Sequence, residues 1–354
     1  MASLERRVAI DAARAAGQLL KSELSGSRRI AYKGSPTNLV TEMDARVEEL
    51  IVGRLAAAFP DDAVLAEERG ATAGRSGRRW IIDPLDGTTN YAHGFPAFGV
   101  SIALESARRI ELGVIYDPNL DELFVAERGH GSTVNDQALS VSTTATLDES
   151  LLATGFPYNI REGGDNNLKE YAAFSVRARA VRRMGSAVLY LAWLASGRLD
   201  GYWELRLGPW DVAAGSLLVE EAGGRITSLS GGALDLDAPT LVATNGRIHE
   251  AVLEVLREIR GDEPSRLRGE RRSDRCRCSS RWRRRGGHRL RLGKRCCGAR
   301  IRGTQDGEEG TCWPWFELWP LQPALAARLL ATFKDRSRAW RGTSYRPRCS
   351  HQAE

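Results

Sequence analysis

The first 260 residues of this 354-residue chain contain no cysteine, because all six cysteines come later. A body of this size without cysteine needs no disulfide bonds and offers no thiolate metal site. No apolar run approaches the roughly 20 residues that cross a bilayer. The first 20 residues lack the apolar core of a signal peptide, since charges interrupt their apolar pattern. We therefore expect a cytoplasmic protein without a membrane-spanning segment.

The composition is that of a globular protein. Hydrophobic residues make up 42% of the chain and charged residues 27%, which argues against disorder throughout. The length suffices for one large domain or two modest ones.

The net charge of +6 is unevenly distributed. Residues 261–354 hold 23 Lys/Arg against 10 Asp/Glu, whereas residues 1–260 hold 28 against 35. A basic balance suggests a nucleic-acid or membrane-surface partner, but here it belongs to the last part of the chain. We expect an acidic body at residues 1–260 and a basic tail, rich in Arg, Cys and Trp, at residues 261–354.

Three interpretations of the tail remain open. The segment Arg281–Arg285 (RWRRR) mixes charge with an aromatic ring, as single-strand nucleic-acid binders do. The second interpretation is a metal site formed by Cys276, Cys278, Cys296 and Cys297, although their spacing is not that of structural zinc. The third interpretation is a disordered segment or a frame-shifted translation of GC-rich DNA, which we favour because clear periodicity is missing before residue 323.

The body alternates between helical and strand-like patterns. Apolar residues recur at helical spacing at residues 4–23, 47–58, 168–178, 186–196, 212–222 and 248–259. Short strand-like runs, bounded by turn residues, cover residues 80–83, 98–104, 112–116, 123–126, 181–184, 201–203, 225–227 and 241–243. Interleaved helices and strands predict a layered α/β or α+β domain.

The segment WIIDPLDGTTNY at residues 80–91 suggests a metal site. A strand leads into Asp83, and Pro84 suits a tight turn that brings Asp83 and Asp86 together. Two clustered carboxylates repel each other and need a cation, and a ligand set of oxygens favours Mg²⁺ or Mn²⁺. Gly87 permits close approach of a ligand, and backbone N–H groups near Thr88 suit a phosphate. The alternative is a solvated turn.

Other acidic residues strengthen the metal hypothesis. Glu67 and Glu68 lie upstream, and the alternative for both is that they are ordinary surface charges. Asp211 lies far downstream, where a helix is expected to begin, so an ordinary N-cap carboxylate is its alternative role.

Two long motifs make the chain resemble the inositol monophosphatase family, within the Mg²⁺-dependent, lithium-sensitive sugar-phosphatase superfamily. They are WIIDPLDGTTNY (80–91) and WDVAAGSLLVEEAGG (210–224), and the resemblance extends over nearly all of residues 1–260. It implies a catalytic domain with a layered α-β-α-β-α sandwich that hydrolyses myo-inositol monophosphate with Mg²⁺ (two or three ions, Mn²⁺ as an alternative), and a homodimer. Histidinol phosphate, a 3′(2′),5′-bisphosphate nucleotide and fructose 1,6-bisphosphate remain alternative substrates.

The resemblance also implies roles for individual residues. The metal ligands would be Glu67, Asp83, the Leu85 carbonyl, Asp86 and Asp211. Glu67 and Thr88 would activate a water molecule, with Asp44 hydrogen-bonded to Thr88. The substrate would contact Asp86, Gly87, Thr88, Ala187, Glu204 and Asp211. Lys33 matches a lysine near the site in some relatives, and His93 is expected to be an ordinary loop residue. A nucleic-acid-binding protein acting through the tail is the alternative of a different class.

Overall fold

The computed structural model describes residues 3–24, 26, 30–32, 39–162 and 164–261, all within one structural unit. The predictions for Lys33 and for residues 262–354 lie outside these residues.

The largest sheet in the described part of the chain has eight strands, in the order β10-β9-β8-β7-β6-β5-β3-β4. β3 and β5 are parallel, and every other neighbouring pair is antiparallel. The strands are β3 (Ala63–Ala66), β4 (Gly70–Thr72), β5 (Arg78–Asp86), β6 (Gly99–Ser106), β7 (Arg109–Asp117), β8 (Glu122–Glu127), β9 (Ser132–Val134) and β10 (Gln137–Ala138).

A smaller sheet among the described residues has the order β12-β11-β13-β15-β14. Its strands are β11 (Leu151–Thr154), β12 (Ala180–Arg182), β13 (Gly201–Glu204), β14 (Arg225–Ser228) and β15 (Leu241–Thr244). β11 runs parallel to β12 and β13, and the remaining pairs are antiparallel. Separately, β1 (Ile30–Tyr32) pairs with β2 (Leu39–Thr41).

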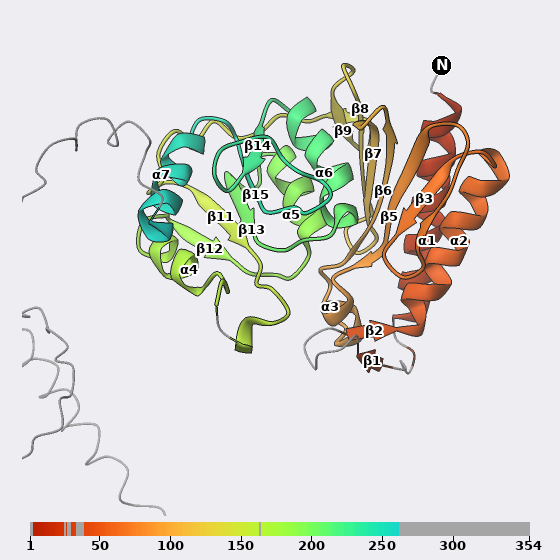
Figure 1. The fold of residues 1–354 in the computed structure, drawn as a ribbon, viewed down its shortest axis with the longest axis horizontal. Helices are drawn as coiled ribbons and strands as arrows, with labels where there is room; N and C mark the ends of the chain where they lie inside the picture. Colours follow the sequence, from red (N-terminus) through yellow and green to blue (C-terminus); the bar gives the residue numbers. More distant parts are fainter. Residues whose placement is uncertain (1–2, 25, 27–29, 33–38, 163, 262–354) are drawn as a thin grey trace, which may run out of the picture. The chain divides into compact units, whose positions relative to one another are not determined.

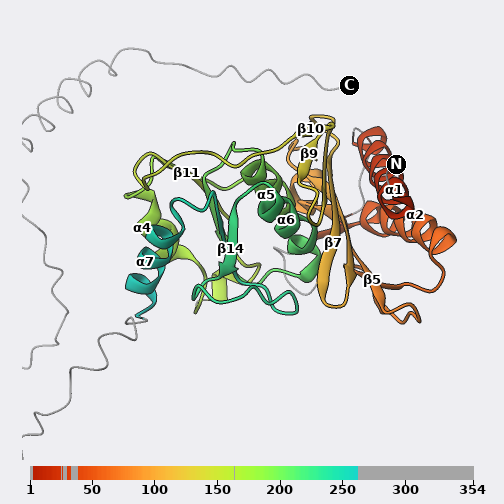
Figure 2. The ribbon, with the colours of Figure 1, turned by 90° about the horizontal axis from the view of Figure 1, so that it is seen from above.

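The helices separate and cover the two sheets (Figures 1 and 2). One face of the large sheet packs against α1 (Leu4–Glu23) and α2 (Glu42–Ala58), and α5 (Ala187–Ala195) and α6 (Pro209–Glu221) fill the space between the sheets. The outer face of the small sheet packs against α4 (Leu168–Ser175) and α7 (His249–Arg260). The predicted layered α-β-α-β-α fold is confirmed. Two short pieces, α3 (Thr88–Ala92) and the 3₁₀ turn η1 (Ile160–Glu162), complete the helices.

The burial of each helix follows its layer. α1 buries one stripe, formed mostly by alanines, as an amphipathic outer helix does. α5 and α6 are instead buried on nearly all sides because each faces a sheet in two directions. Within the described residues, no helix combines the length and the apolar character needed to cross a membrane.

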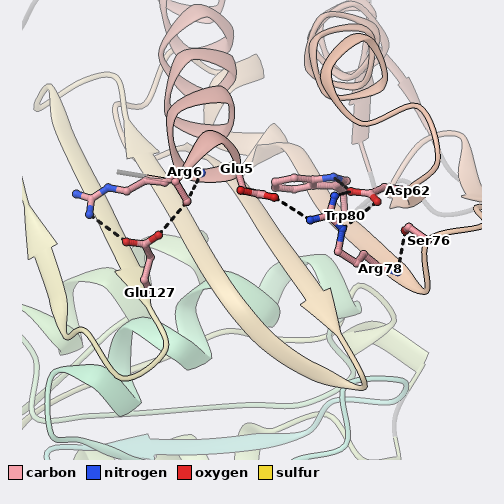
Figure 3. Close-up of polar contacts among 8 residues, drawn as sticks. Glu5, Arg6, Asp62, Ser76, Arg78, Trp80 and Glu127 are labelled. Atoms are coloured by element: carbon pink, nitrogen blue, oxygen red, sulfur yellow. Dashed lines mark hydrogen bonds and ion pairs between the residues drawn. The ribbon is translucent and has the colours of Figure 1, made fainter. Parts of the chain in front are cut away.

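Ion pairs fix the start of β5 against α1 and the turn that follows α2 (Figure 3). The Arg78 guanidinium donates to Glu5 of α1 at 2.8 Å and to Asp62 at 3.0 Å. The Trp80 indole N–H donates to the same Asp62 carboxylate at 3.0 Å. Because the opposite end of β5 carries Asp83 and Asp86, this network contributes to the placement of those carboxylates.

Candidate active site

The end of β5 is irregular, and this irregularity brings Asp83 and Asp86 to one place. The pairing with β6 is regular up to Asp83 and shifts before Asp86. Pro84 lies within the shift, and it has no N–H to donate to a neighbouring strand. Gly87 follows with φ +86°, and a Cβ there would lie 2.7 Å from the Ala97 carbonyl oxygen. Only glycine fits this turn without strain.

Three carboxylates converge beyond this strand. Asp83, Asp86 and Asp211 each place one carboxylate oxygen within 4.8 Å of the other two. Asp211 is the third residue of α6, and its Oδ2 accepts a hydrogen bond from the Gly208 N–H at 2.6 Å. Asp211 therefore helps to cap the start of α6, but it does so from the third position of the helix. Gly208 occupies the N-cap position that was the alternative role expected for Asp211.

The remaining oxygens of the cluster are held unequally. Asp86 Oδ2 accepts from the Val188 N–H at 3.0 Å and from the Ser186 hydroxyl. Asp83 Oδ1 accepts from the Leu85 N–H at 3.0 Å, but the buried Asp83 Oδ2 has no hydrogen-bond partner among the described residues. An unsatisfied carboxylate oxygen in the interior is costly, so this atom is suited to be a ligand of a cation.

Electrostatics at the cluster lead to the same conclusion. Burial, followed by the charges of Glu67, Asp86 and Asp211, raises the pKa of Asp83 well above its usual range. Burial and neighbouring carboxylates raise the pKa of Asp211 in the same way, and burial raises the pKa of Asp86 to about 6. A divalent cation would remove this repulsion, and a donor set made of oxygens suits Mg²⁺ or Mn²⁺. The residues present therefore fit a metal.

Thr88 connects the cluster to a buried acid. Its hydroxyl lies 2.9 Å from Asp44 Oδ1 and 3.0 Å from the Leu85 carbonyl oxygen. Asp44 is 1% exposed, and its Oδ2 accepts from the Thr41 N–H and hydroxyl, both at 2.7 Å. The same residues cap the start of α2, so helix formation fixes Asp44 relative to Thr88.

Two adjoining hollows open onto these groups. The smaller, of about 310 Å³, is lined by Glu67, Asp83, Leu85, Asp86, Gly87, Thr88 and Asp211 together with residues of the segment 206–210 and Tyr158. The larger, of about 470 Å³, shares Asp86, Gly87, Thr88 and Asp211 with it and adds Ala187 and Glu204. The structure thus brings every predicted metal and substrate residue to one region, with Asp44 directly behind it.

Glu204 is one of the acidic residues that line the larger hollow. Its Oε2 accepts from the Tyr202 hydroxyl at 2.6 Å, and burial raises its pKa to about 7. Gly155 makes room for it, because a Cβ there would lie 1.9 Å from Glu204 Oε1. His93 is exposed and lines the same hollow, without a described contact that gives it a chemical role.

Comparison with known proteins identifies the family. A model of the inositol monophosphatase family matches residues 3–260. The chain belongs to the inositol monophosphatase family. It is 42% identical over 254 residues to the inositol-1-monophosphatase of Mesorhizobium japonicum, covering 71% of this chain and 95% of that protein. It is also 39% identical over 258 residues to the protein named Nus factor SuhB of Escherichia coli strain K12, covering 72% of this chain and 96% of that protein.

Solved structures support the same assignment for the fold. The inositol monophosphatase from Anabaena (Nostoc) sp. matches with a TM-score of 0.65 at 41% identity, covering 74% of this chain and 97% of that chain. The extragenic suppressor protein suhB from Bartonella henselae matches with a TM-score of 0.68 at 38% identity, covering 72% and 99%. Membership of the inositol monophosphatase family, which is metal-dependent, supports a phosphatase of this superfamily.

One residue that positions this inositol monophosphatase-family site was not predicted. Glu48 of α2 is 2% exposed. It accepts from the N–H of Glu68 at 2.8 Å, the N–H of Arg69 at 3.1 Å and the Arg69 side chain at 2.8 Å. It therefore holds the turn that directly follows Glu67. A glutamate within the apolar stripe of α2, one turn after Asp44, is the sequence pattern that indicates such a role.

Proposed function

We propose that this protein is a Mg²⁺-dependent phosphatase that hydrolyses myo-inositol monophosphate to inositol and phosphate. The observation that carries the proposal is the convergence of Asp83, Asp86 and Asp211 within 4.8 Å, with one buried oxygen of Asp83 left without a described partner. The chemistry that bound Mg²⁺ supplies is neutralisation of the phosphoryl oxygens, ionisation of water near neutral pH and stabilisation of the leaving alkoxide.

The chain would hold the metal through Glu67, Asp83, the Leu85 carbonyl, Asp86 and Asp211. Each of these five residues lines the smaller hollow. Mn²⁺ is an alternative ion, because it also prefers oxygen ligands. Glu48 would keep Glu67 in place through the turn at 68–69.

Thr88, Asp44 and Glu67 would orient the attacking water and receive its proton. The Thr88 hydroxyl donates its hydrogen to Asp44 Oδ1 at 2.9 Å, so its lone pairs are available to accept from water. Direct attack by water needs no covalent protein nucleophile, because phosphoryl transfer gains chiefly from positioning and electrostatics.

The larger hollow would bind the substrate. Backbone at Gly87 and Thr88 would contact the phosphate, next to Asp86 and Asp211. Glu204 and Ala187 line the same hollow, where a carboxylate such as Glu204 can accept hydrogen bonds from the hydroxyls of a polyol.

The proposal is tested by removing single charges from the cluster. We expect Asp86→Asn and Asp211→Asn to abolish Mg²⁺-dependent phosphate release from inositol 1-phosphate and to leave the circular dichroism spectrum unchanged. Asp11→Asn, at an exposed position of α1, is the matched control and retains activity. Near-normal turnover in either cluster variant would contradict the metal assignment.

The choice of substrate and several family properties are part of the same proposal. Histidinol phosphate, a bisphosphorylated nucleotide and fructose 1,6-bisphosphate are the alternative substrates, and a phosphate-release screen with and without Li⁺ ranks them. Inhibition by Li⁺ and a homodimer are predictions from the resemblance, and a cytoplasmic location is a prediction from the composition of the body.

A second candidate function follows from relatives that carry the name Nus factor SuhB. Such a role would involve binding to other macromolecules, with the basic tail as the predicted nucleic-acid contact. RNA binding that weakens with salt and disappears when the tail is deleted would support it. Phosphate release that survives the deletion would separate the two functions.

A further inference from the structure

Two arginines in the larger hollow lack an acidic partner among the described residues. Arg183 follows β12, Arg206 follows β13, and both line the larger hollow and are exposed. Arg206 also lines the smaller hollow beside the carboxylate cluster. Many other arginines in the described part of the chain do form ion pairs, as Arg79 does with Glu105 at 2.8 Å.

Arg183 is held over an aromatic ring. Its guanidinium carbon lies 4.8 Å from the centroid of the Phe156 ring, a distance typical of a cation–π contact. The ring leaves the N–H groups at the edge of the guanidinium available to a ligand. Its positive charge acts on Glu204, whose pKa it lowers against the larger effect of burial, so the two groups belong to one site.

Arg206 has an unusual backbone. Its φ is +59°, the left-handed conformation that residues with a side chain rarely adopt. It lies between Glu204 and Asp211 in the chain, where β13 turns toward α6. Strained conformations of this kind concentrate at ligand-binding sites, and here the strained residue carries a cation into the wall of both hollows.

The charges in the hollow exceed what a polyol monophosphate requires. The phosphate that is hydrolysed would be bound at the carboxylate cluster with its cations, and the hydroxyls of a polyol need acceptors and donors such as Glu204 and carry no charge. Two further guanidinium groups are the groups that proteins use to bind a phosphate or carboxylate in a bidentate manner.

We propose that Arg206 and Arg183 form a second anion subsite in the larger hollow. The subsite takes a phosphate monoester whose alcohol part carries another negatively charged group, either a phosphate or a carboxylate. This inference rests on the proposed phosphatase function and extends its substrate range to phosphate monoesters whose alcohol part carries a second anionic group.

The test compares kcat/KM for three phosphate esters in the full-length protein with Mg²⁺. Fructose 1,6-bisphosphate carries a second phosphate, 2-phosphoglycerate carries a carboxylate, and inositol 1-phosphate carries neither. We expect Arg206→Gln to lower kcat/KM for at least one of the first two, relative to inositol 1-phosphate, by tenfold or more and mainly through KM. Arg183→Gln should change kcat/KM in the same direction. Arg206→Lys should lose less of kcat/KM than Arg206→Gln does. The ester that responds identifies the second anion as phosphate or carboxylate.

Folding and general charge effects are controlled within the same series. Glutamine and lysine keep a side chain at residue 206, so the backbone strain is the same in every variant. Arg247→Gln is the matched control, since Arg247 is exposed, has no described ion pair and lines neither hollow. If Arg206→Gln hydrolyses inositol 1-phosphate and the kcat/KM values of the other two esters relative to inositol 1-phosphate are unchanged, the subsite is wrong. The proposed phosphatase function then still stands. No turnover of any ester by the unmodified protein overturns both proposals.

Discussion

The carboxylate of Asp83 is in an unfavourable environment, and no interaction within the described residues fully compensates for it. Asp83 is 1% exposed, and its Oδ2 has no hydrogen-bond partner among the described residues. Three neighbouring carboxylates raise its pKa further. A buried, repelling set of this kind is typical of functional sites, and a bound cation converts the cost into ligand affinity.

At the same scale, Glu48 provides a test of positioning. We expect Glu48→Gln to reduce kcat/KM for inositol 1-phosphate about tenfold, which corresponds to about 1.4 kcal/mol, because its carboxylate holds the turn after Glu67. The concentration of Mg²⁺ that gives half-maximal activity should rise, since Glu67 is a proposed metal ligand. A Mg²⁺ titration of phosphate release measures both effects.

The neighbouring residue serves as the control. Glu49 is exposed on α2 and has no described contact with the turn, so Glu49→Gln should leave the Mg²⁺ titration unchanged. A Glu48→Gln variant that loses stability but keeps the same half-maximal Mg²⁺ concentration would show that Glu48 is structural only.

The site residues differ in how far the sequence alone predicts them. Asp83 and Asp86 lie in one short motif, so local turn chemistry is enough to group them. Asp211 and Glu204 are more than 100 residues away from Asp83, and the family resemblance alone links them to it. Glu48 was not predicted because its partners, the N–H groups of Glu68 and Arg69 and the Arg69 side chain, come close to it only in the folded chain.

At the scale of elements, close packing of α6 against the large sheet determines where Asp211 lies. A Cβ at Gly113 of β7 would lie 2.6 Å from the Ala214 carbonyl oxygen and 3.0 Å from its Cα. These are backbone atoms of α6, so the added carbon can be accommodated only if the helix moves.

We expect Gly113→Ala to destabilise the protein by about 1–3 kcal/mol, the usual range for overpacking a core. Chemical denaturation measures the free energy of unfolding. Gly53→Ala is the matched control: Gly53 is exposed in α2 and a Cβ there meets nothing within 4 Å. That substitution should stabilise the protein by about 0.5–1 kcal/mol through helix propensity. Equal effects of the two substitutions would contradict the packing argument.

The elements follow the sequence wherever the pattern is long. The helix predicted at residues 4–23 begins and ends where α1 does. The helix predicted at residues 47–58 ends with α2 at Ala58, although α2 already begins at Glu42. Seven short strands in the described part of the chain were not predicted, because two to four residues acquire strand structure only from their neighbours in the sheet: β1, β2, β3, β4, β9, β10 and β11. The N–H groups near Thr88, which the sequence suggests for phosphate binding, belong to the five-residue helix α3.

At the scale of the whole molecule, the charge separates the described layers from the tail. The net charge of +6 combines a body with excess acid and a tail with 23 Lys/Arg against 10 Asp/Glu. The basic balance of the complete chain therefore says little about the substrate of the site, whose chemistry depends on carboxylates in the body.

Deleting the residues after Asp262 tests this division. We expect the shortened protein to remain soluble and to keep Mg²⁺-dependent phosphate release within about twofold, because every proposed site residue precedes Arg260 and lies in the layered fold. Size-exclusion chromatography and a phosphate-release assay measure both properties. Loss of both would show that the tail is part of the folded enzyme.

The central claim is that the carboxylates of Asp83, Asp86 and Asp211 bind the cations that make phosphate-ester hydrolysis possible. Its most direct test is phosphate release from inositol 1-phosphate by chelator-treated protein, with Mg²⁺ added back in steps. The account predicts no release without metal and a saturable rise with Mg²⁺ that is absent in Asp211→Asn. Release that persists without metal, or a full rise in Asp211→Asn, would contradict it.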